Sequence, residues 1–542
     1  MSSSFIARQV PPAFFLWTEG AFGPSRVAEF VTRMIKPLAA LPNNSNQTPH
    51  LKGTAESPVL FPASLPDQDS LIAQQPGSAW IAAAGCLLIA ALIFAPWAFG
   101  SRPPIPSAIL AGLTALSFLS WGYGLWSENR LPKVPVVCGI CLVLLLGMMC
   151  VSLANPQSTY DPISDRFVPA PRYRPYLPST VDVANSLPAV LCLSGLLLAL
   201  PVAADLSAQE IWRRSFLITI GWNGFAVVVA ALILKAGAFP ALERSLEQRT
   251  WAQGEVFGPL DYHGSAATLI NLTLPALGFF AAESATAARR IFLIAVLGVM
   301  VTGALVDTSR TGLVLTLLMT TALARMITHA WKRQPLANAE ARLQRRAVIA
   351  VLVICAISMV TTVRNGGSRA LDRLQSIKHE LTWPWYPRYQ QNHAAWEISQ
   401  QHPWFGTGLG SYKLLVPHSR LRGQYFAAPY RPGQSYTVLN HHVQNDYLQT
   451  LLEWGWTGLL VWATLLGTAS LGLICNFRRT ASPSAFATVA AVALTGIFLH
   501  AVVDSPFQVP AIQLCAIVFI GLAFSQLNER PLLTATPSTH GL

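Results

Sequence analysis

The chain has 542 residues, of which 52% are hydrophobic and only 11% charged, whereas about a quarter of the residues of a soluble domain are charged. Its apolar residues lie in blocks of about 16 to 25, a pattern that a lipid bilayer requires and that excludes an ordinary soluble protein. The formal net charge of +12 indicates topology signals and anionic membrane lipids, and no basic cluster interleaved with aromatic residues favours nucleic-acid binding.

Residues 1–78 precede the first apolar block and are rich in Pro, Ser, Asn and Gln. A segment of this composition cannot bury enough apolar surface to fold. It also lacks the compact apolar core behind a basic start that marks a secretory signal. We therefore predict a disordered cytoplasmic tail over 1–78, with an overlong gene start as the alternative.

Twelve apolar segments are long enough to be predicted as membrane spans. They lie at residues 79–99, 105–126, 134–153, 186–204, 214–238, 263–283, 290–306, 311–330, 347–362, 448–473, 483–503 and 508–526. We therefore predict an all-α integral membrane protein of about 12 transmembrane helices. Nine of them fall within 79–362, a long and partly helical loop follows at 363–447, and 448–526 holds the last three before a tail at 527–542.

Basic residues assign the connections to the two faces of the membrane. The inner connections, each of which carries Lys or Arg as the positive-inside rule expects, are 127–133, 205–213, 284–289, 331–346 and 474–482. Both termini are then cytoplasmic, and 363–447 is a large loop on the outer face. That loop is also basic, which reflects either the tolerance of long loops or a surface that faces an anionic substrate.

Four polar segments fall on the predicted outer face. The first, Asp307–Gly312, is a tight turn between two spans, where Arg310 either lies among lipid headgroups or points into a cavity and finds a partner. The second contains Arg388 among Trp and Tyr residues that could stack on sugars or form an interfacial aromatic belt. A glycine run follows it, which could cradle a phosphate but lacks the strand–loop–helix context, so a turn that lets backbones pass closely is favoured.

The third segment, Asn440–Gln449, runs into the tenth span. Asp446 followed by Gln449 fits a capping box, so we predict that a helix begins here. His441 and His442 then lie at its water-facing start, where a neutral imidazole can accept a proton. Neither this pair nor the eight cysteines, all in or beside apolar blocks, has metal-ligand spacing, so we predict no metal and no cofactor.

The fourth segment, His500–Pro510, is a polar break between the last two spans. Asp504 lies where the eleventh span surfaces. It could orient a histidine or neutralise an arginine.

In their order and spacing, these segments resemble the O-antigen ligase and O-antigen polymerase superfamily of bacterial membrane glycan-transfer proteins. The resemblance covers about residues 255–525 and is carried by several pieces together. They are Gly258–His263 leading into Ala266 and Pro275, Ser309–Gly312, Arg388 before Pro403, Gly406-x-Gly408, Asn445–Gln449 before Gly455-x-x-Gly458, and His500-x-x-x-Asp504-x-Pro506.

The resemblance implies a metal-independent, inverting transfer of an undecaprenyl-diphosphate-linked glycan at the periplasmic face of the bacterial inner membrane. The acceptor hydroxyl, on a glycan, lipid A core or protein, would attack the anomeric carbon while the lipid diphosphate departs. A base must then reach the hydroxyl, and cations must stabilise the diphosphate. The resemblance assigns Arg310 and Arg388 to the diphosphate.

One position departs from the family pattern. In ligases of this family the catalytic histidine immediately precedes the Asn that corresponds to Asn445, and here that position is Gln444, which cannot act as a general base. His442 is the nearest substitute and His441 the next. Gln444, Asn445, Asp446, Tyr447 and Asp504 are expected to support the site.

Two other functions remain open from the sequence. A transporter or flippase-like protein would place ionisable groups near the membrane midplane, often in repeated halves, whereas the notable charges here cluster at outer helix ends. An inactive scaffold of a polysaccharide assembly complex would explain Gln444.

Overall fold

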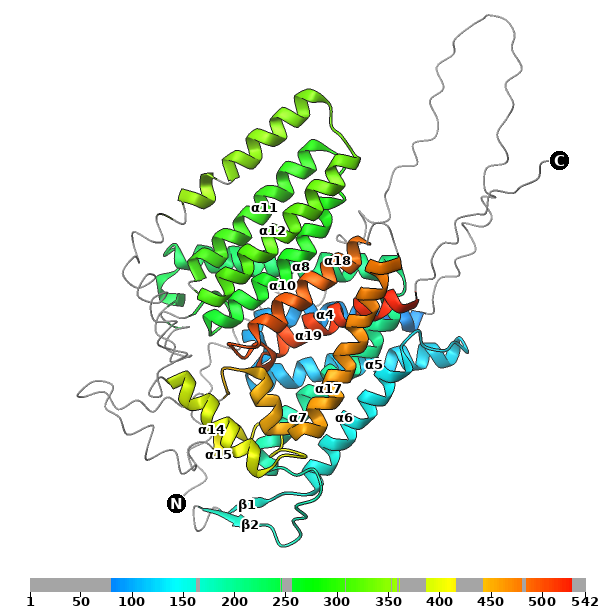
Figure 1. Ribbon diagram of the computed structural model, residues 1–542, viewed down its shortest axis with the longest axis vertical. Coiled ribbons are helices and arrows are strands. Elements are labelled where there is room, and N and C mark those ends of the chain that lie inside the picture. The colour runs from blue at the N-terminus through cyan, green and yellow to red at the C-terminus, as the bar shows by residue number, and fades with distance from the viewer. Residues whose placement is uncertain are drawn as a thin grey trace, which may run out of the picture. The chain divides into compact units, whose positions relative to one another are not determined.

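The computed structural model describes most of the chain after residue 78 (Figure 1). The described residues are 79–161, 166–243, 256–307, 309–351, 353–357, 387–415, 442–479 and 484–528, with the single positions 245 and 360. The predicted tails at 1–78 and, apart from Leu527 and Asn528, at 527–542 lie outside these ranges, as does much of the predicted loop at 363–447.

The prediction of an all-α membrane protein is confirmed. Ten described helices are long and apolar enough to cross a membrane: α4 (Ala79–Trp97), α5 (Pro104–Ser127), α6 (Val136–Ala154), α7 (Val183–Leu206), α8 (Glu210–Lys235), α10 (His263–Ala282), α11 (Ala287–Asp307), α12 (Arg310–Arg333), α17 (Asp446–Arg479) and α19 (Pro510–Asn528). Each coincides with a predicted span.

The two remaining predicted spans differ from these. The segment 483–503 forms α18 (Ala485–His500), whose 16 residues give about 24 Å of helix, less than the roughly 30 Å of a hydrocarbon core. The segment 347–362 continues a helix that occupies residues 338–351 and 353–357, and its end lies outside the described residues.

Short elements fill the connections. They are the 3-10 helices η1 (Phe99–Ser101) and η3 (Pro506–Gln508), the helices α14 (Pro387–Gln401) and α15 (Tyr412–Leu415), and the antiparallel strands β1 (Ser158–Asp161) and β2 (Arg166–Pro169). The predicted long loop is therefore partly helical, as expected. The hairpin lies beyond the ends of α6 and α7 (Figure 1).

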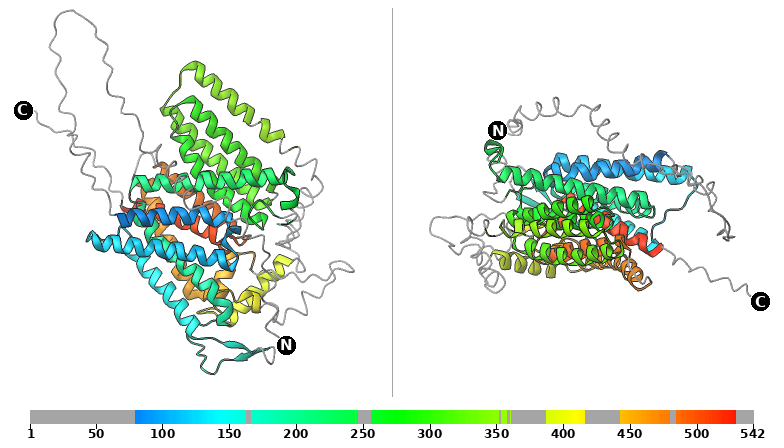
Figure 2. Two further views of the ribbon diagram at one scale, coloured as in Figure 1. Left: turned by 180° about the vertical axis from the view of Figure 1, so that it is seen from behind. Right: turned by 90° about the horizontal axis from the view of Figure 1, so that it is seen from above.

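Helix α10 forms the centre of the packing. Every residue of α10 from Gly264 to Ala282 is buried, and the helix contacts α8, α11, α12 and α18 (Figure 1). Helices α4 and α5 lie side by side next to α7 (Figure 2), and α19 packs between α7 and α17. A helix that is buried all round is held by its neighbours on every side, so the start of α10 is a rigid support for any side chain placed there.

One end of the bundle is held together by basic residues. At this basic end, the buried carboxylate of Asp205 accepts hydrogen bonds from Trp121 Nε1 at 2.9 Å and from Arg130 Nη2 at 2.7 Å. Arg290 is fully buried and donates to the carbonyl oxygens of Ser284 and Gln334, each at 2.8 Å. These arginines therefore link neighbouring interhelical connections by hydrogen bonds. The sequence suggested for them only the role of marking the inner face of the membrane.

Candidate functional site

The opposite end of the bundle gathers most of the residues that the sequence singled out. There the backbone N–H of Asp446 donates to the carbonyl of Ala501 at 3.0 Å. Its carboxylate accepts from the backbone N–H of Phe507 at 2.7 Å and from Gln508 Nε2 at 2.9 Å. Both carboxylate oxygens are thus used to fix the turn between α18 and α19 to the start of α17, which makes Asp446 a positioning residue.

Asp504 lies buried in that turn. Its Oδ2 accepts a hydrogen bond from the Tyr262 hydroxyl at 3.2 Å, and its Oδ1 accepts from the backbone N–H of Ser505 at 2.8 Å. A side chain at Gly264, in the first turn of α10, would collide with this carboxylate. The start of α10 and the α18–α19 turn therefore both contact the Asp504 carboxyl group.

His500 and Asp504 form a buried pair, in which His500 Nε2 lies 3.7 Å from Asp504 Oδ2. His500 Nδ1 lies 2.8 Å from Thr268 Oγ1, and this hydroxyl also lies 2.9 Å from the carbonyl oxygen of Gly264. The end of α18 is thereby joined to the start of α10.

Arg388 reaches this turn from a distant part of the sequence. It lies in the first turn of α14, which packs on α17 (Figure 1), and its Nη1 donates to the carbonyl of Val503 at 3.4 Å. Its charge and that of Asp504 both act on His500. A half-buried guanidinium therefore lies beside the His500–Asp504 pair, where Arg388 can receive an anion.

Arg310 is the first residue of α12 and is half-buried. The hydroxyl of Ser309 caps this helix by accepting from the backbone N–H of Gly312 at 3.3 Å. A capped helix start with an arginine in its first turn favours an anion through both the helix dipole and the side-chain charge. Asp307, at the end of α11, interacts electrostatically with Asp504. The turn between α11 and α12 is therefore close to the α18–α19 turn.

The capping prediction was right about the helix start and wrong about the capping residue. Helix α17 begins at Asp446, but Asn445 is the cap: its Oδ1 accepts from the backbone N–H of Tyr447 at 3.0 Å and of Leu448 at 3.1 Å. Gln449 Oε1 accepts instead from the backbone N–H of Val443 at 2.7 Å. Asp446 is thereby freed to bind the α18–α19 turn.

His442 and Gln444 lie on either side of Val443, whose side chain is fully buried against α14 residues such as Ala394 and Ile398. Both flanking side chains are half-buried, and Gln444 Oε1 has no hydrogen-bond partner among the described residues. The buried valine fixes the backbone from which His442 and Gln444 project. His441 lies outside the described residues.

The glycine loop at 406–410 does not present its backbone to a ligand. The N–H groups of Thr407 and Gly408 donate to the carbonyls of Leu452 and Glu453 at 2.9 and 3.0 Å, and that of Gly410 donates to Glu453 Oε1 at 3.0 Å. These donors are therefore unavailable to a phosphate, and the interpretation as a turn that lets backbones pass closely is supported.

The same segment forms hydrogen bonds with α17 at a break in this helix. At Gly455 the helix has φ 64° and ψ −171°, and α17 is bent in Figure 1. The N–H groups of Trp456 and Thr457, which would bond to Leu452 and Glu453 in a continuous helix, donate instead to the carbonyls of Pro403 and Trp404 at 2.8 and 3.0 Å. The loop thus satisfies the polar groups that the break exposes.

Substituting Gly455 by alanine should destabilise the protein by roughly 2 kcal/mol or more, because an L side chain is strained at this φ. The new Cβ would also lie 2.5 Å from the Trp404 carbonyl carbon. Thermal unfolding of the purified chain in detergent measures the change. Gly467→Ala is the matched control, since Gly467 lies in the same helix with nothing within 4 Å of an added Cβ. Equal midpoints for the two variants would contradict the inserted-loop account.

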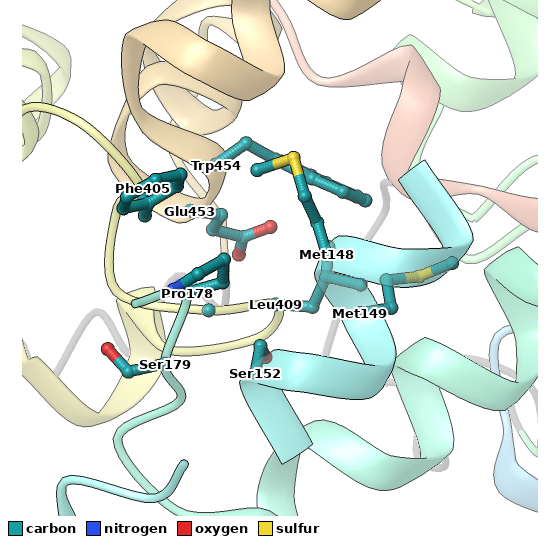
Figure 3. A pocket seen from close by; sticks show the side chains of 10 residues that line it. Met148, Met149, Ser152, Pro178, Ser179, Phe405, Leu409, Glu453 and Trp454 are labelled. Carbon is teal, nitrogen blue, oxygen red and sulfur yellow. The ribbon is translucent and has the colours of Figure 1, made fainter. Parts of the chain in front are cut away.

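A small, partly open pocket lies behind the glycine loop (Figure 3). Its walls include Met148, Phe405 and Trp454, and Glu453 is the one carboxylate among its lining residues. Glu453 Oε1 accepts from Gln449 Nε2 at 2.6 Å as well as from the loop, so this carboxylate tethers the loop to α17. Arg310, Arg388, His442 and Asp504 do not line this pocket.

The structure places Arg388, Asp446, Tyr447 and Asp504 around the α18–α19 turn; the Tyr447 hydroxyl donates to the carbonyl of Phe498 at 3.0 Å. Asn445 and Gln444 follow His442 at the start of α17, and Arg310 lies at the start of α12. Sequence reasoning missed the roles of three groups near Asp504: Tyr262 and His500, which face its carboxyl group, and Thr268, which contacts His500. The spacing of His500 and Asp504 by four residues, one helical turn, was the available signal.

The match to known proteins concerns the second half of this fold. Residues 291–463 match the family model described as O-antigen ligase. The matched segment begins in α11, ends in α17 after the Gly455 break, and contains Arg310, Arg388 and His442. The resemblance seen in the sequence is thereby confirmed, and the match supports membrane glycan transfer of the ligase or polymerase type. Comparison with curated proteins gives no match.

Proposed function

We propose that this chain, which carries an O-antigen ligase domain at residues 291–463, transfers an undecaprenyl-diphosphate-linked glycan to an acceptor hydroxyl. The observation that carries the proposal is the contact of Arg388 with the carbonyl of Val503, because it brings a cation from the matched domain to the buried His500–Asp504 pair. An anionic leaving group needs such a cation.

The proposed reaction is a single displacement that inverts the anomeric carbon and uses no metal. The acceptor oxygen forms a bond to that carbon while the bond from the carbon to the diphosphate oxygen breaks. The acceptor proton passes to His442, with His441 as the second candidate, and the bonding electrons leave with the diphosphate. Arg310 and Arg388 stabilise the charge that develops on the leaving group.

In this proposal the site faces the periplasm from the bacterial inner membrane. The basic end, with Arg130 and Arg290, then faces the cytoplasm together with both termini, in agreement with the positive-inside rule. The loop at 363–447 is periplasmic, and its described helix α14 carries Arg388 over the outer end of the bundle. The acceptor is a glycan, lipid A core or a protein.

Reconstitution of the purified full chain in liposomes tests the proposal. We expect transfer of the glycan from an added polyisoprenyl-diphosphate donor to one of the three acceptor classes, with an inverted anomeric configuration by nuclear magnetic resonance and an unchanged rate in chelator. If no glycan is transferred to any of the three acceptor classes, the proposal is wrong. Uptake of the free glycan into the liposomes would favour a transporter instead.

A further inference from the structure

Asp307 is a buried carboxylate for which the described part of the fold provides no adequate partner. It is the last residue of α11 and is only 4% exposed. The Ser309 amide lies nearby, but neither carboxyl oxygen has a hydrogen bond of normal geometry to a described residue. A buried carboxyl group without such bonds is unfavourable for folding in either protonation state, which points to a ligand.

The surroundings of Asp307 also disfavour a purely structural role. A carboxylate at the C-terminal end of a helix faces the negative end of the helix dipole. Of the charged groups that act on it, Lys235 attracts it and Asp504 repels it, and Lys235 is itself paired with Glu243 at 3.1 Å. The missing partner is therefore expected to be a hydrogen-bond donor that arrives from outside the fold.

The next turn limits the chemistry of that donor. Arg310 begins α12 three residues later, at a capped helix start that favours an anion. A carboxyl group beside this site has two oxygens that accept hydrogen bonds from hydroxyl groups, whichever protonation state it has. A sugar attached to a diphosphate supplies both: phosphate oxygens for the cation and, next to them, ring hydroxyls for the carboxylate.

We propose that Asp307 accepts a hydrogen bond from a hydroxyl group of the sugar directly attached to the diphosphate, and so selects the donor by its first sugar. This inference rests on the proposed function, because it takes a glycosyl diphosphate as the donor. It assigns neighbouring roles to the two ends of one turn, with Arg310 on the diphosphate and Asp307 on the sugar.

Binding of two kinds of probe to the full chain in nanodiscs tests the inference. One probe is geranylgeranyl diphosphate, and the others are the same lipid carrying one glucose, galactose or N-acetylglucosamine. We expect at least one sugar to tighten wild-type binding about tenfold, as one hydrogen bond to an otherwise unsatisfied buried group does. Asp307→Asn should lose most of that gain, because the amide offers one acceptor oxygen where the carboxyl group has two, and it should bind the bare diphosphate with wild-type affinity.

Controls separate this inference from the proposed function. Asp161→Asn, on β1, removes another carboxylate and should leave both affinities unchanged. Asp307→Asn should unfold at the wild-type temperature or above it, whereas a structural carboxylate would lower that temperature. A sugar gain that survives Asp307→Asn, or no gain with any sugar in the wild type, would overturn the inference. If Arg310→Gln still bound the bare diphosphate normally, the diphosphate assignment of the proposed function would fail instead.

Discussion

Replacing His442 by alanine is expected to lower kcat for glycan transfer by about 10² to 10⁴, the usual contribution of a positioned general base. The resemblance implies that Gln444 stands where ligases of the family have their base, and Gln444 cannot accept the proton. His442 projects from a backbone fixed by buried Val443, next to the capped start of α17. Initial rates with saturating donor and acceptor measure the effect, and KM should change little.

Two variants control this result. His441→Ala should retain most of the activity if His442 is the base. Gln444→His in the His442→Ala background should recover part of the lost rate, because it places an imidazole where the family has one. Wild-type polysaccharide output from a chain lacking both His441 and His442 would instead favour the role of an inactive scaffold.

Replacing Arg388 by alanine is expected to lower kcat by about 10² to 10³, as when one preorganised donor to a developing negative charge is removed. Arg388 is held by α14 against the carbonyl of Val503, so its guanidinium is positioned before the donor binds. Arg388→Lys should fall between wild type and Arg388→Ala, because it keeps the charge but loses the fork of donors.

The matched control is Arg172→Ala, which removes an exposed arginine from the predicted outer connection between α6 and α7. It should leave the rate unchanged, since an exposed charge far from the leaving group is screened by solvent. Equal rates for Arg388→Ala and wild type would exclude Arg388 from diphosphate stabilisation.

Hydropathy predicted the membrane helices because the physical requirement is local. A span needs about 20 apolar residues in sequence, and ten described helices follow that rule. It also predicted the span at 448–473, but it did not show that α17 breaks at Gly455 within this segment. A broken helix depends on a partner for its exposed backbone groups, and Pro403–Gly408 supplies that partner from about 50 residues earlier.

The residue types of the candidate site could be predicted, but their partners could not. The sequence singled out Asp504 and Arg388, yet it could not show that Tyr262 donates to Asp504 or that Arg388 reaches Val503. It identified Asp446 as a helix cap because Asn445 and Asp446 are equally good capping residues by type. Only the position of Phe507 decides between them, by using the Asp446 carboxylate.

The burial of Asp307 was likewise invisible in the sequence. An acidic residue in a short turn between two spans is usually solvated, and the pattern around Asp307 and Arg310 fits that interpretation equally well. The charges that act on Asp307 come from Lys235 on α8 and Asp504 in the α18–α19 turn, which lie in distant parts of the chain.

The pairing of residues 403–408 with 452–457 also constrains the order of assembly. Before the pairing forms, a continuous helix over residues 446–479 would satisfy its own backbone hydrogen bonds, so we expect this segment to be straight. The region that carries Arg388 then has no bent helix on which to dock. We therefore expect the membrane helices to insert first, and the bend in α17 and the docking of α14 to occur together as one late cooperative step.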